Sequence, residues 1–425
     1  MPSTNSTAKI PPISHALMRS SFCTDCFCKN VFSLFSIAIN SRSNICKKVY
    51  KKTTSANRLV FLVKLATHTH MISKESVLQA LSHVEDPDLK KDLVTLGMIQ
   101  DIQIEGNTLR FTVVLTTPAC PMKDMLENAC RNAIFHFIDK NIDLHITMTA
   151  NVSTQANPSV PGVKNIIAVA SGKGGVGKST VAVNLALGLA QSGAKVGLID
   201  ADIYGPSIPM MFGLEGAKPQ TSETADGKTR IQPITKYGIQ LLSIGFFTDP
   251  NQPVPWRGPM ASTAVTQLLN DADWGELDYL VIDLPPGTGD IHITLTQKFP
   301  IAGALIVTTP QQVALADARK GIGMFMMNSI NVPVLGVVEN MSYFTPAELP
   351  ENKYYIFGTG GGQALATEFN LPFLGEIPLV KSISDAGDAG KPVILEPENP
   401  MAAAFLDLAT RVAQQVAIQN ASVAT

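Results

Sequence analysis

Residues 171–180 read Ser-Gly-Lys-Gly-Gly-Val-Gly-Lys-Ser-Thr and directly follow the apolar run Asn165-Ile-Ile-Ala-Val-Ala170. An apolar strand, a glycine-rich loop and a helix in this order form a pocket for phosphate groups. Glycines let backbone N–H groups turn inward, and the N-terminus of the helix favours an anion. The loop matches the pattern G-x-x-x-x-G-K-[ST] from Gly172 to Ser179, so the sequence predicts a nucleotide-binding site.

The loop also carries the side chains that such a site needs. Lys178 is expected to reach the outer phosphates, and the Ser179 hydroxyl is expected to ligate Mg²⁺. The residues expected to bind the nucleotide are Gly172, Lys173, Gly174, Gly175, Val176, Gly177, Lys178, Ser179 and Thr180.

Carboxylates follow two further apolar runs, at Asp200 and Asp202 and at Asp283. Ligands of open α/β sheets bind beyond the carboxyl ends of the strands, so these side chains are expected to face the nucleotide. Asp202 is the candidate for orienting the attacking water. Asp283 is expected to hold Mg²⁺, and Asp200 either helps through a water or only caps the following turn.

Apolar strand patterns alternate with helical patterns throughout residues 163–425. We expect strands at 165–170, 195–200, 278–283, 303–308, 333–338 and 372–377. This alternation predicts an α/β fold, a P-loop NTPase domain whose mostly parallel sheet has helices on both faces.

Residues 71–150 predict a small α+β domain, which the polar linker 151–162 joins to the larger one. Ser73 is a candidate N-cap for a helix over 73–83. Strands over 98–104 and 108–115 flank Gly106 as a hairpin, and a helix over 122–139 and a strand over 144–149 follow.

Residues 1–70 lack this periodicity and hold ten Lys and Arg against one Asp. Three interpretations stay open. The segment can be a transit peptide, a metal-binding tail that uses Cys23, Cys26 and Cys28, or sequence upstream of a true start at Met71. The clean helix start after Met71 favours the third, in which case residues 1–70 are not part of the protein.

The loop has an additional lysine, Lys173, which an ordinary phosphate-binding loop lacks. The form K-G-G-V-G-K-[ST] resembles the deviant Walker A loop of MinD, ParA, the nitrogenase iron protein and the Mrp/ApbC/Nbp35 proteins. The run D-L-P-P-G-T-G-D at 283–290 resembles the Mrp form. The resemblance implies a homodimer in which Lys173 reaches the partner's nucleotide and assists hydrolysis, with switch I at 200–207 and switch II at 285–289.

The same resemblance implies that Asn340 binds the adenine edge, although a turn asparagine is the alternative. The GTP-type motif N-K-x-D is absent there, which favours ATP. In the small domain, the pattern E-D-P-D-L…G-M-I…L-T-T-P-A-C-P resembles the MIP18 (DUF59) domain of iron–sulfur assembly proteins.

The cysteines depart from the family pattern. Many Mrp/ApbC/Nbp35 proteins carry C-x-x-C after the N-M-S-Y motif, but residues 341–362 contain no cysteine. Cys120 precedes a predicted helix, so we expect a lowered thiol pKa and a candidate iron–sulfur ligand. Cys130 is expected to be a small buried apolar residue. A [4Fe–4S] cluster would then need ligands from two subunits or from another molecule. The chain is similar in this to the HCF101-type proteins, which join a MIP18 domain to an Mrp ATPase and also lack the usual C-x-x-C.

The combined interpretation is a cytoplasmic, homodimeric, Mg²⁺-dependent ATPase that carries iron–sulfur clusters to apo-proteins, with assembly factors as further partners. The alternative is a MinD- or ParA-like positioning ATPase without a cluster. Residues 71–425 hold 23 Lys and Arg against 34 Asp and Glu, which disfavours nucleic acid as a partner. The C-terminal helix pattern at 401–418 has one Arg and one Asp and disfavours membrane binding.

Overall fold

The computed structural model describes residues 72–154, 159–223, 227, 229–248, 255–346, 348–349 and 351–423. The chain divides into two units after Met71, and the fold below is that of the second unit, Ile72–Thr425. The hypotheses about residues 1–70, with Cys23, Cys26, Cys28 and a start at Met71, lie outside the described residues. Among the described helices, none is long and apolar enough to cross a membrane.

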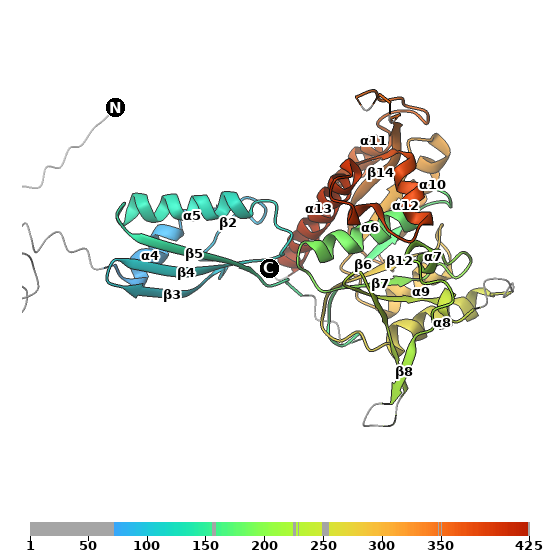
Figure 1. Ribbon diagram of the computed structural model, residues 1–425, viewed down its shortest axis with the longest axis horizontal. Helices are drawn as coiled ribbons and strands as arrows, with labels where there is room; N and C mark the ends of the chain where they lie inside the picture. Colours follow the sequence, from blue (N-terminus) through green and yellow to red (C-terminus); the bar gives the residue numbers. More distant parts are fainter. Residues whose placement is uncertain are drawn as a thin grey trace, which may run out of the picture. The chain divides into compact units, whose positions relative to one another are not determined.

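The first part of the second unit is a small α+β fold (Figure 1). Its sheet has the order β3-β4-β5, with β3 and β4 antiparallel and β4 and β5 parallel. The elements are α4 (Lys74–Leu81), β1 (Glu85–Asp86), β2 (Lys91–Asp92), β3 (Ile99–Glu105), β4 (Thr108–Leu115), α5 (Lys123–Phe137) and β5 (Asp143–Ala150).

Local sequence explains these elements. The side chain of Ser73 accepts from the Ser76 backbone, and the Ser76 side chain accepts from the Ser73 backbone, which is a capping box. Strand β4 alternates between buried and less buried residues, as expected for a sheet with one covered face. Its buried side chains pack with those of α4 and α5 in one core: Val77, Leu81, Leu109, Phe111, Val113, Leu126, Cys130 and Ile134.

The second part is built on an eight-stranded sheet with the order β10-β11-β7-β12-β6-β13-β14-β15. All neighbours are parallel except β10 and β11. The strands are β6 (Val163–Ala170), β7 (Val196–Asp200), β10 (Ile234–Lys236), β11 (Ile239–Ser243), β12 (Leu277–Asp283), β13 (Gly303–Thr308), β14 (Val334–Phe344) and β15 (Phe373–Leu379). The predicted fold class is confirmed.

Both faces of this sheet are covered, because alternate residues of its strands enter two different cores. In β6, Ile167 and Val169 join one core, while Ile166 and Ala168 join the other. The first core takes residues of α6 (Lys178–Gln191), α7 (Ile208–Met211), α12 (Lys381–Asp388) and α13 (Pro400–Val423). The second takes residues of α8 (Gly258–Asp271), α9 (Asp290–Lys298), α10 (Gln312–Phe325) and α11 (Gly361–Glu368).

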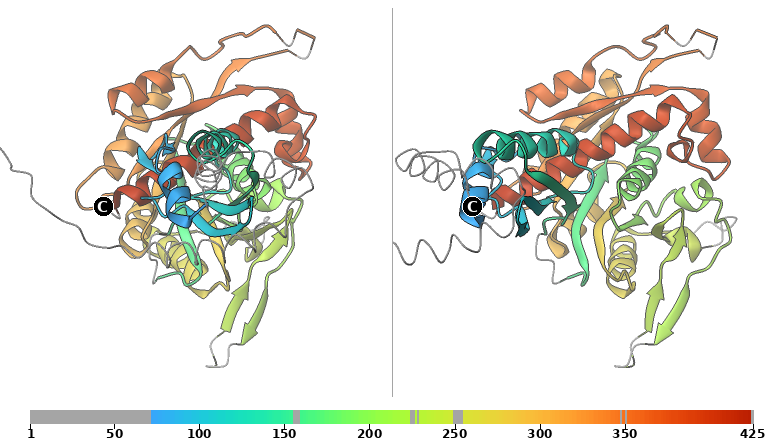
Figure 2. Two further views of the ribbon diagram at one scale, coloured as in Figure 1. Left: turned by 90° about the vertical axis from the view of Figure 1, so that its left-hand side faces the viewer. Right: turned by 60° about the vertical axis from the view of Figure 1, so that its left-hand side comes forward.

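Four strands of this part are absent from the sequence-based prediction. Strands β10 and β11 extend one edge of the sheet, and β8 (Gln220–Glu223) pairs with β9 (Thr229–Gln232) as a separate antiparallel hairpin. Figure 2 shows this hairpin, in yellow-green, projecting from the layers of the sheet. No residue of β8 or β9 is fully buried, so these strands lack the apolar alternation that predicts a strand.

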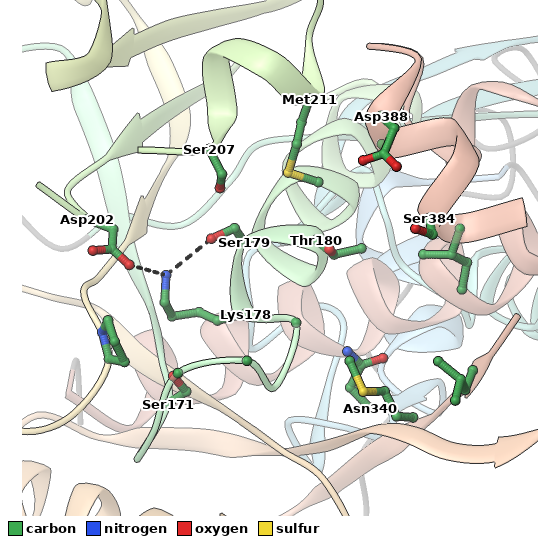
Figure 3. A pocket seen from close by; sticks show the side chains of 18 of the residues that line it. Ser171, Lys178, Ser179, Thr180, Asp202, Ser207, Met211, Asn340, Ser384 and Asp388 are labelled. Atoms are coloured by element: carbon green, nitrogen blue, oxygen red, sulfur yellow. Dashed lines mark hydrogen bonds and ion pairs between the residues drawn. The ribbon is translucent and has the colours of Figure 1, made fainter. Parts of the chain in front are cut away.

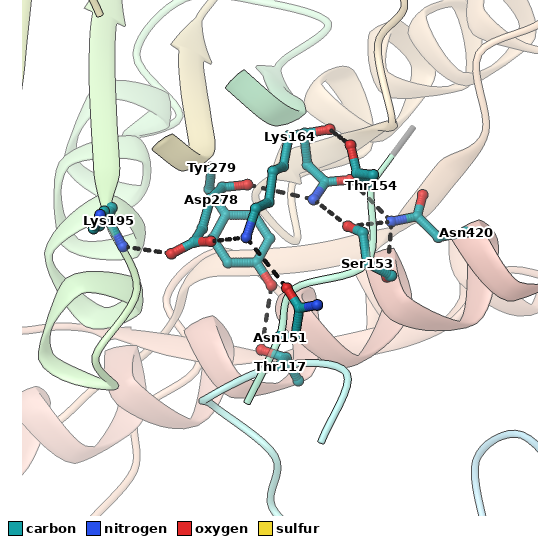
Figure 4. Close-up of polar contacts among 10 residues, drawn as sticks. Thr117, Asn151, Ser153, Thr154, Lys164, Lys195, Asp278, Tyr279 and Asn420 are labelled. Atoms are coloured by element: carbon teal, nitrogen blue, oxygen red, sulfur yellow. Dashed lines mark hydrogen bonds and ion pairs between the residues drawn. The ribbon is translucent and has the colours of Figure 1, made fainter. Parts of the chain in front are cut away.

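The described ends of the predicted linker are packed against the protein. Val152 and Val160 are buried. Asn420 of α13 donates to Asn165 of β6 at 2.9 Å and also to Ser153 (Figure 4). The chain between the two sheets is therefore held by side-chain contacts at both of its described ends.

Contacts beside this segment also join the small fold to the large sheet. The Tyr279 hydroxyl donates to Thr117 at 3.2 Å, and Lys164, whose ammonium pairs with Asp278 within the large sheet, also donates to Asn151 Oδ1 at 3.5 Å (Figure 4). Strand β12 therefore begins at this junction and ends at Asp283, in the predicted nucleotide site.

Candidate nucleotide-binding site

The glycine-rich loop connects β6 to α6, as the sequence predicts. Gly177 immediately precedes α6 with φ of 79°, in the left-handed region that favours glycine. A Cβ atom at this position would lie 2.1 Å from the side-chain nitrogen of Asn340. Only glycine therefore fits the turn that brings the loop into α6.

A cavity of about 490 Å³ opens over this loop (Figure 3). Its walls come from the loop, from the segment after β7, from the ends of β14 and β15, and from α12. Of the predicted residues, these line it: Lys173, Gly174, Gly175, Gly177, Lys178, Ser179, Thr180, Asp202 and Asn340. Gly172, Val176, Asp200 and Asp283 are not among the residues that line it.

Lys178 stands at the centre of a buried charge cluster. Its ammonium lies 2.6 Å from Asp283 Oδ1 and 3.7 Å from Asp202 Oδ2, and it donates to the Ser179 hydroxyl at 3.3 Å. Lys178 is 6% exposed and Asp283 is 0% exposed. A buried ion pair of this kind is tightly constrained, because removal of one partner leaves an uncompensated charge.

The two carboxylates of this cluster have raised pKa values. Burial raises the pKa of Asp283, and the neighbouring Lys178 ammonium opposes that shift. Burial likewise raises the pKa of Asp202, again against the pull of Lys178. Both carboxylates would be stabilised as anions by additional positive charge in the cavity.

The donor set at this end of the cavity fits Mg²⁺. Asp283 Oδ2 is buried and has no hydrogen-bond partner among the described residues, and Ser179 lies beside the same carboxylate. A carboxylate and a hydroxyl oxygen are ligands that Mg²⁺ accepts, together with waters and phosphate oxygens.

Asp200 holds the backbone that follows β7, as the second of its two predicted roles describes. It is 0% exposed, and its Oδ2 accepts from the Ser243 hydroxyl at 3.0 Å and from the Ile208 backbone N–H at 3.2 Å. Its Oδ1 accepts from the Asp202 backbone N–H. Burial, and then the charge of Asp283, raise the pKa of Asp200 to about 7. Asp200 thus anchors both ends of the predicted switch I segment.

Ser243 is a site residue that sequence reasoning missed. It ends β11, which lies beside β7, and its hydroxyl both donates to Asp200 and accepts from the Gly245 backbone N–H. A polar residue at the carboxyl end of a strand could have identified it, but that strand was not predicted.

Asn340 lies at the end of the cavity away from Asp202 (Figure 3). Its Nδ2 donates to the Val176 carbonyl of the loop at 2.8 Å, and the residue is 5% exposed. This contact fixes the amide against the loop and leaves its oxygen for a hydrogen-bond donor.

Sequence reasoning also missed the residues that form the far wall of the cavity. Met211 of α7 and Ser384 and Asp388 of α12 line it, opposite Asn340 (Figure 3). No local motif marks these residues, because α12 follows the last strand of the sheet and reaches the cavity only through the fold.

The predicted switch II is held against the loop. The Gly287 backbone N–H donates to the Ser171 carbonyl at 2.9 Å, and Pro286 lines the cavity. Gly287 has φ of 92°, which a side chain rarely adopts. Loop and switch II therefore form one hydrogen-bonded edge of the cavity.

Lys173 lines the same cavity, and its ammonium has no ion pair or hydrogen bond within the part of the chain that the structure describes. It contrasts with Lys178, which is committed to two carboxylates. The structure thus leaves the Lys173 charge available to a ligand.

The thiols differ from each other as predicted, but the expected pKa of Cys120 was wrong. Burial raises the pKa of the Cys120 thiol, and the charges of Asp86 and Asp88 add to this, while the Met122 backbone N–H only partly opposes it. Cys130 is 0% exposed in the small core, as expected. Among the described residues, no three His, Cys, Asp or Glu side chains form a group that could hold a metal ion.

Known proteins resemble this chain over most of its length. Residues 162–413 match the family model described as NUBPL iron-transfer P-loop NTPase, within the ParA group, and residues 74–137 match the iron–sulfur cluster assembly protein model. An iron–sulfur cluster carrier protein of Synechocystis sp. is 48% identical over 355 residues, which are 82% of this chain and 99% of that protein.

The chloroplastic Fe–S cluster assembly factor HCF101 of Arabidopsis thaliana is 40% identical and covers 93% of this chain and 74% of its own length. A solved nucleotide-binding protein from Archaeoglobus fulgidus, in complex with ADP, is 38% identical over 56% of this chain and 90% of its own, with a TM-score of 0.48. The family model covers more than half of the chain, which therefore belongs to the NUBPL-type iron-transfer P-loop NTPases.

Proposed function

We propose that this chain is a Mg²⁺-dependent ATPase that carries iron–sulfur clusters to apo-proteins. The observation that carries the proposal is the Lys178 cluster at the carboxyl ends of parallel strands, beside a cavity of nucleotide size. The cargo follows from relatives that are named cluster carriers and cover most of the chain. The same relatives favour this function over a positioning ATPase without a cluster.

The cavity supports defined roles for the nucleotide-binding residues. The loop backbone from Gly172 to Thr180 would cradle the phosphates, and Lys178 would leave the carboxylates to contact them. The free oxygen of Asn340 would accept a hydrogen bond from the adenine amino group. Its nitrogen, which already donates to Val176, keeps the amide oriented for that contact.

Hydrolysis would use the carboxylates at the other end of the cavity. Asp202 would orient the attacking water, and Ser179 and Asp283 would hold Mg²⁺, which neutralises charge on the outer phosphates when bound. Asp200, held by Ser243, would keep the switch I backbone in place around Asp202.

A second copy of the chain would complete the site. Lys173 lines the cavity without a partner among the described residues, which fits a charge that acts on the other subunit's nucleotide. A charge supplied from a partner stabilises phosphoryl transfer by about 10³- to 10⁵-fold in comparable enzymes. Hydrolysis would therefore depend on the homodimer.

The cargo site would also need more than one chain. Within the described part of the chain the free thiols are Cys120 and Cys130, and Cys130 is packed inside the small core. Iron–sulfur clusters are held by several thiolates, so Cys120 would supply one ligand, with others from the second subunit, an assembly factor or the recipient. The predicted cytoplasmic location belongs to the same proposal.

Two assays on the full-length chain test the proposal. Phosphate release from Mg·ATP should be measurable, and Lys173→Ala should retain ATP binding while it loses most of its turnover. Lys320→Ala is the matched control, because that lysine is 74% exposed and forms a pair only with Asp317 of its own helix. Failure to bind Mg·ATP would overturn the ATPase proposal.

Anaerobic reconstitution with iron and sulfide tests the cargo. We expect cluster absorbance in the wild type and in a variant with serine at positions 23, 26 and 28, and a loss of it in Cys120→Ala. Cys130→Ala is the control, since it removes a thiol from the same domain. A cluster that binds equally well without Cys120 would exclude this thiol as a ligand, and no cluster in any variant would remove the carrier function.

A further inference from the structure

His292 is the buried titratable residue that the proposed function leaves unexplained. It lies in the first turn of α9, the helix that switch II leads into, and it is 1% exposed. Its backbone N–H donates to the Gly289 carbonyl at 3.1 Å. Its neighbours Ile291 and Leu295 belong to the apolar core on that face of the sheet.

The imidazole has no hydrogen-bond partner among the described residues at either ring nitrogen. Burial lowers its pKa to about 4, so the ring is neutral at pH 7 and carries one N–H donor and one acceptor. Buried polar groups in folded proteins are nearly always paired, and an unpaired one requires a reason. A partner that arrives in another state of the site is such a reason.

Switch II offers that partner. The backbone carbonyls of Gly289 and Pro285 lie near enough to the ring to raise its pKa against the effect of burial, although neither has the distance and angle of a full hydrogen bond. Cβ atoms added at Gly287 and Gly289 would meet nothing within 4 Å, so the space beside these two loop residues is open. Rotation of one peptide group of the loop is the change that would bring a carbonyl to the ring N–H.

We infer that His292 is a positioning residue for switch II: its ring N–H donates to a switch II backbone carbonyl when a nucleoside triphosphate is bound, and thereby holds the loop in the hydrolysing conformation. The inference rests on the proposed ATP hydrolysis. It assigns His292 no contact with the nucleotide. The contact forms in the triphosphate state, so its loss should lower kcat and leave ADP binding unchanged.

The test compares His292→Leu, which removes both polar atoms, with His292→Gln, which keeps a donor and an acceptor. We expect kcat to fall about 10- to 100-fold in His292→Leu, as for other small displacements of reacting groups, with the affinity for ADP within about twofold of wild type. His292→Gln should recover most of the turnover. His145→Gln is the control, because that side chain is 49% exposed on β5.

A kcat for His292→Leu equal to that of wild type would overturn the inference, as would equal defects in folded Leu and Gln variants. If the variants do not fold, ¹⁵N NMR of the wild-type histidine rings decides. A slowly exchanging ring N–H should appear with a non-hydrolysable ATP analogue and be absent with ADP, and identical spectra would refute the contact. Absence of wild-type hydrolysis would remove the proposed function instead, which keeps the two failures distinct.

Discussion

The nucleotide cavity gathers side chains from segments spread over more than 200 residues, whereas the crevice beside Cys120 is small and holds one thiol. The crevice has a volume of about 10 Å³ and is lined by Cys120, the Asp86–Leu89 turn and α13 residues such as Gln414. In the cavity, buried opposite charges already face one another before any ligand is present.

The two sites therefore differ in how a ligand can bind: the cavity is formed in advance, and the crevice is not. The cavity is preorganised for a small anionic ligand, because the sheet fixes its loop backbone and the carboxylate at the end of β12. At Cys120, by contrast, the raised thiol pKa and the narrow crevice mean that the proposed cluster binding would need further ligands and an opening of the junction with α13. The nucleotide cavity would drive the cycle of ATP binding and hydrolysis. The Cys120 crevice would become a binding site only when a partner supplies further ligands.

The largest effect is expected from removing Lys178, the charge at the centre of the cluster beside the cavity. Lys178→Ala should reduce turnover about 1,000-fold, because it removes the expected phosphate contact and leaves the buried Asp283 and the partly buried Asp202 without a cation. The free energy of unfolding should fall by about 3 kcal/mol at pH 7. Phosphate release and urea unfolding measure the two effects, and more than a tenth of wild-type turnover would contradict the assigned role.

A pH titration of stability compares the buried imidazole of His292, on the helix that follows switch II, with an exposed histidine on β5. The pKa of His292 is about 4 in the folded state and about 6.5 in the unfolded chain, so only the unfolded chain binds this proton between those values. The free energy of unfolding should therefore decrease as the pH falls from about 6.5 to about 4, by up to about 3 kcal/mol.

His292→Leu should remove this part of the pH dependence, and His145→Gln should leave it in place. The difference between the wild-type and variant curves isolates His292 from Asp200, whose raised pKa acts in the opposite direction over nearly the same range. Parallel curves for wild type and His292→Leu would contradict the lowered pKa.

Two glycines, one in the loop and one outside the cavity, test the claim that the cavity is preformed. Gly177→Ala should weaken ATP binding about 10- to 100-fold, because φ of 79° and the nearby Asn340 nitrogen make the substitution strained. Gly323→Ala should leave ATP binding unchanged, because Gly323 lies on α10 outside the cavity and an added Cβ would meet nothing within 4 Å. Calorimetric titration with ATP measures both, and equal affinities would refute the geometric argument.

The smallest expected effect concerns the Cys120 crevice. Gln414 donates to Asp88 at 2.6 Å across the junction of α13 with the small fold. Gln414→Ala should lower the free energy of unfolding by about 1 kcal/mol and speed alkylation of Cys120 by several-fold, as peptide mass spectrometry would show. Arg411→Ala, which breaks an exposed pair on the same helix, is the control. Equal alkylation rates in both variants would mean that this contact does not close the crevice.

Features that depend on neighbours in the chain were predictable from the sequence. The phosphate loop, the Ser73 cap, the Gly106 hairpin and the strands that end at Asp200 and Asp283 all follow from local patterns of glycine, capping residues and apolar periodicity. These patterns act over a few residues, so they determined the fold class and the position of the phosphate site.

Contacts between residues that are distant in the sequence were decided only by the tertiary structure. Ser243 meets Asp200 across 43 positions, and Asn340 meets Val176 across 164. Burial, too, belongs to the fold: it raises the Cys120 pKa although the thiol precedes a helix, because desolvation and two nearby carboxylates outweigh one backbone N–H. The residues next to an ionisable side chain in the sequence do not show how deeply the packed sheet will bury it. That burial shifts the pKa values at both sites.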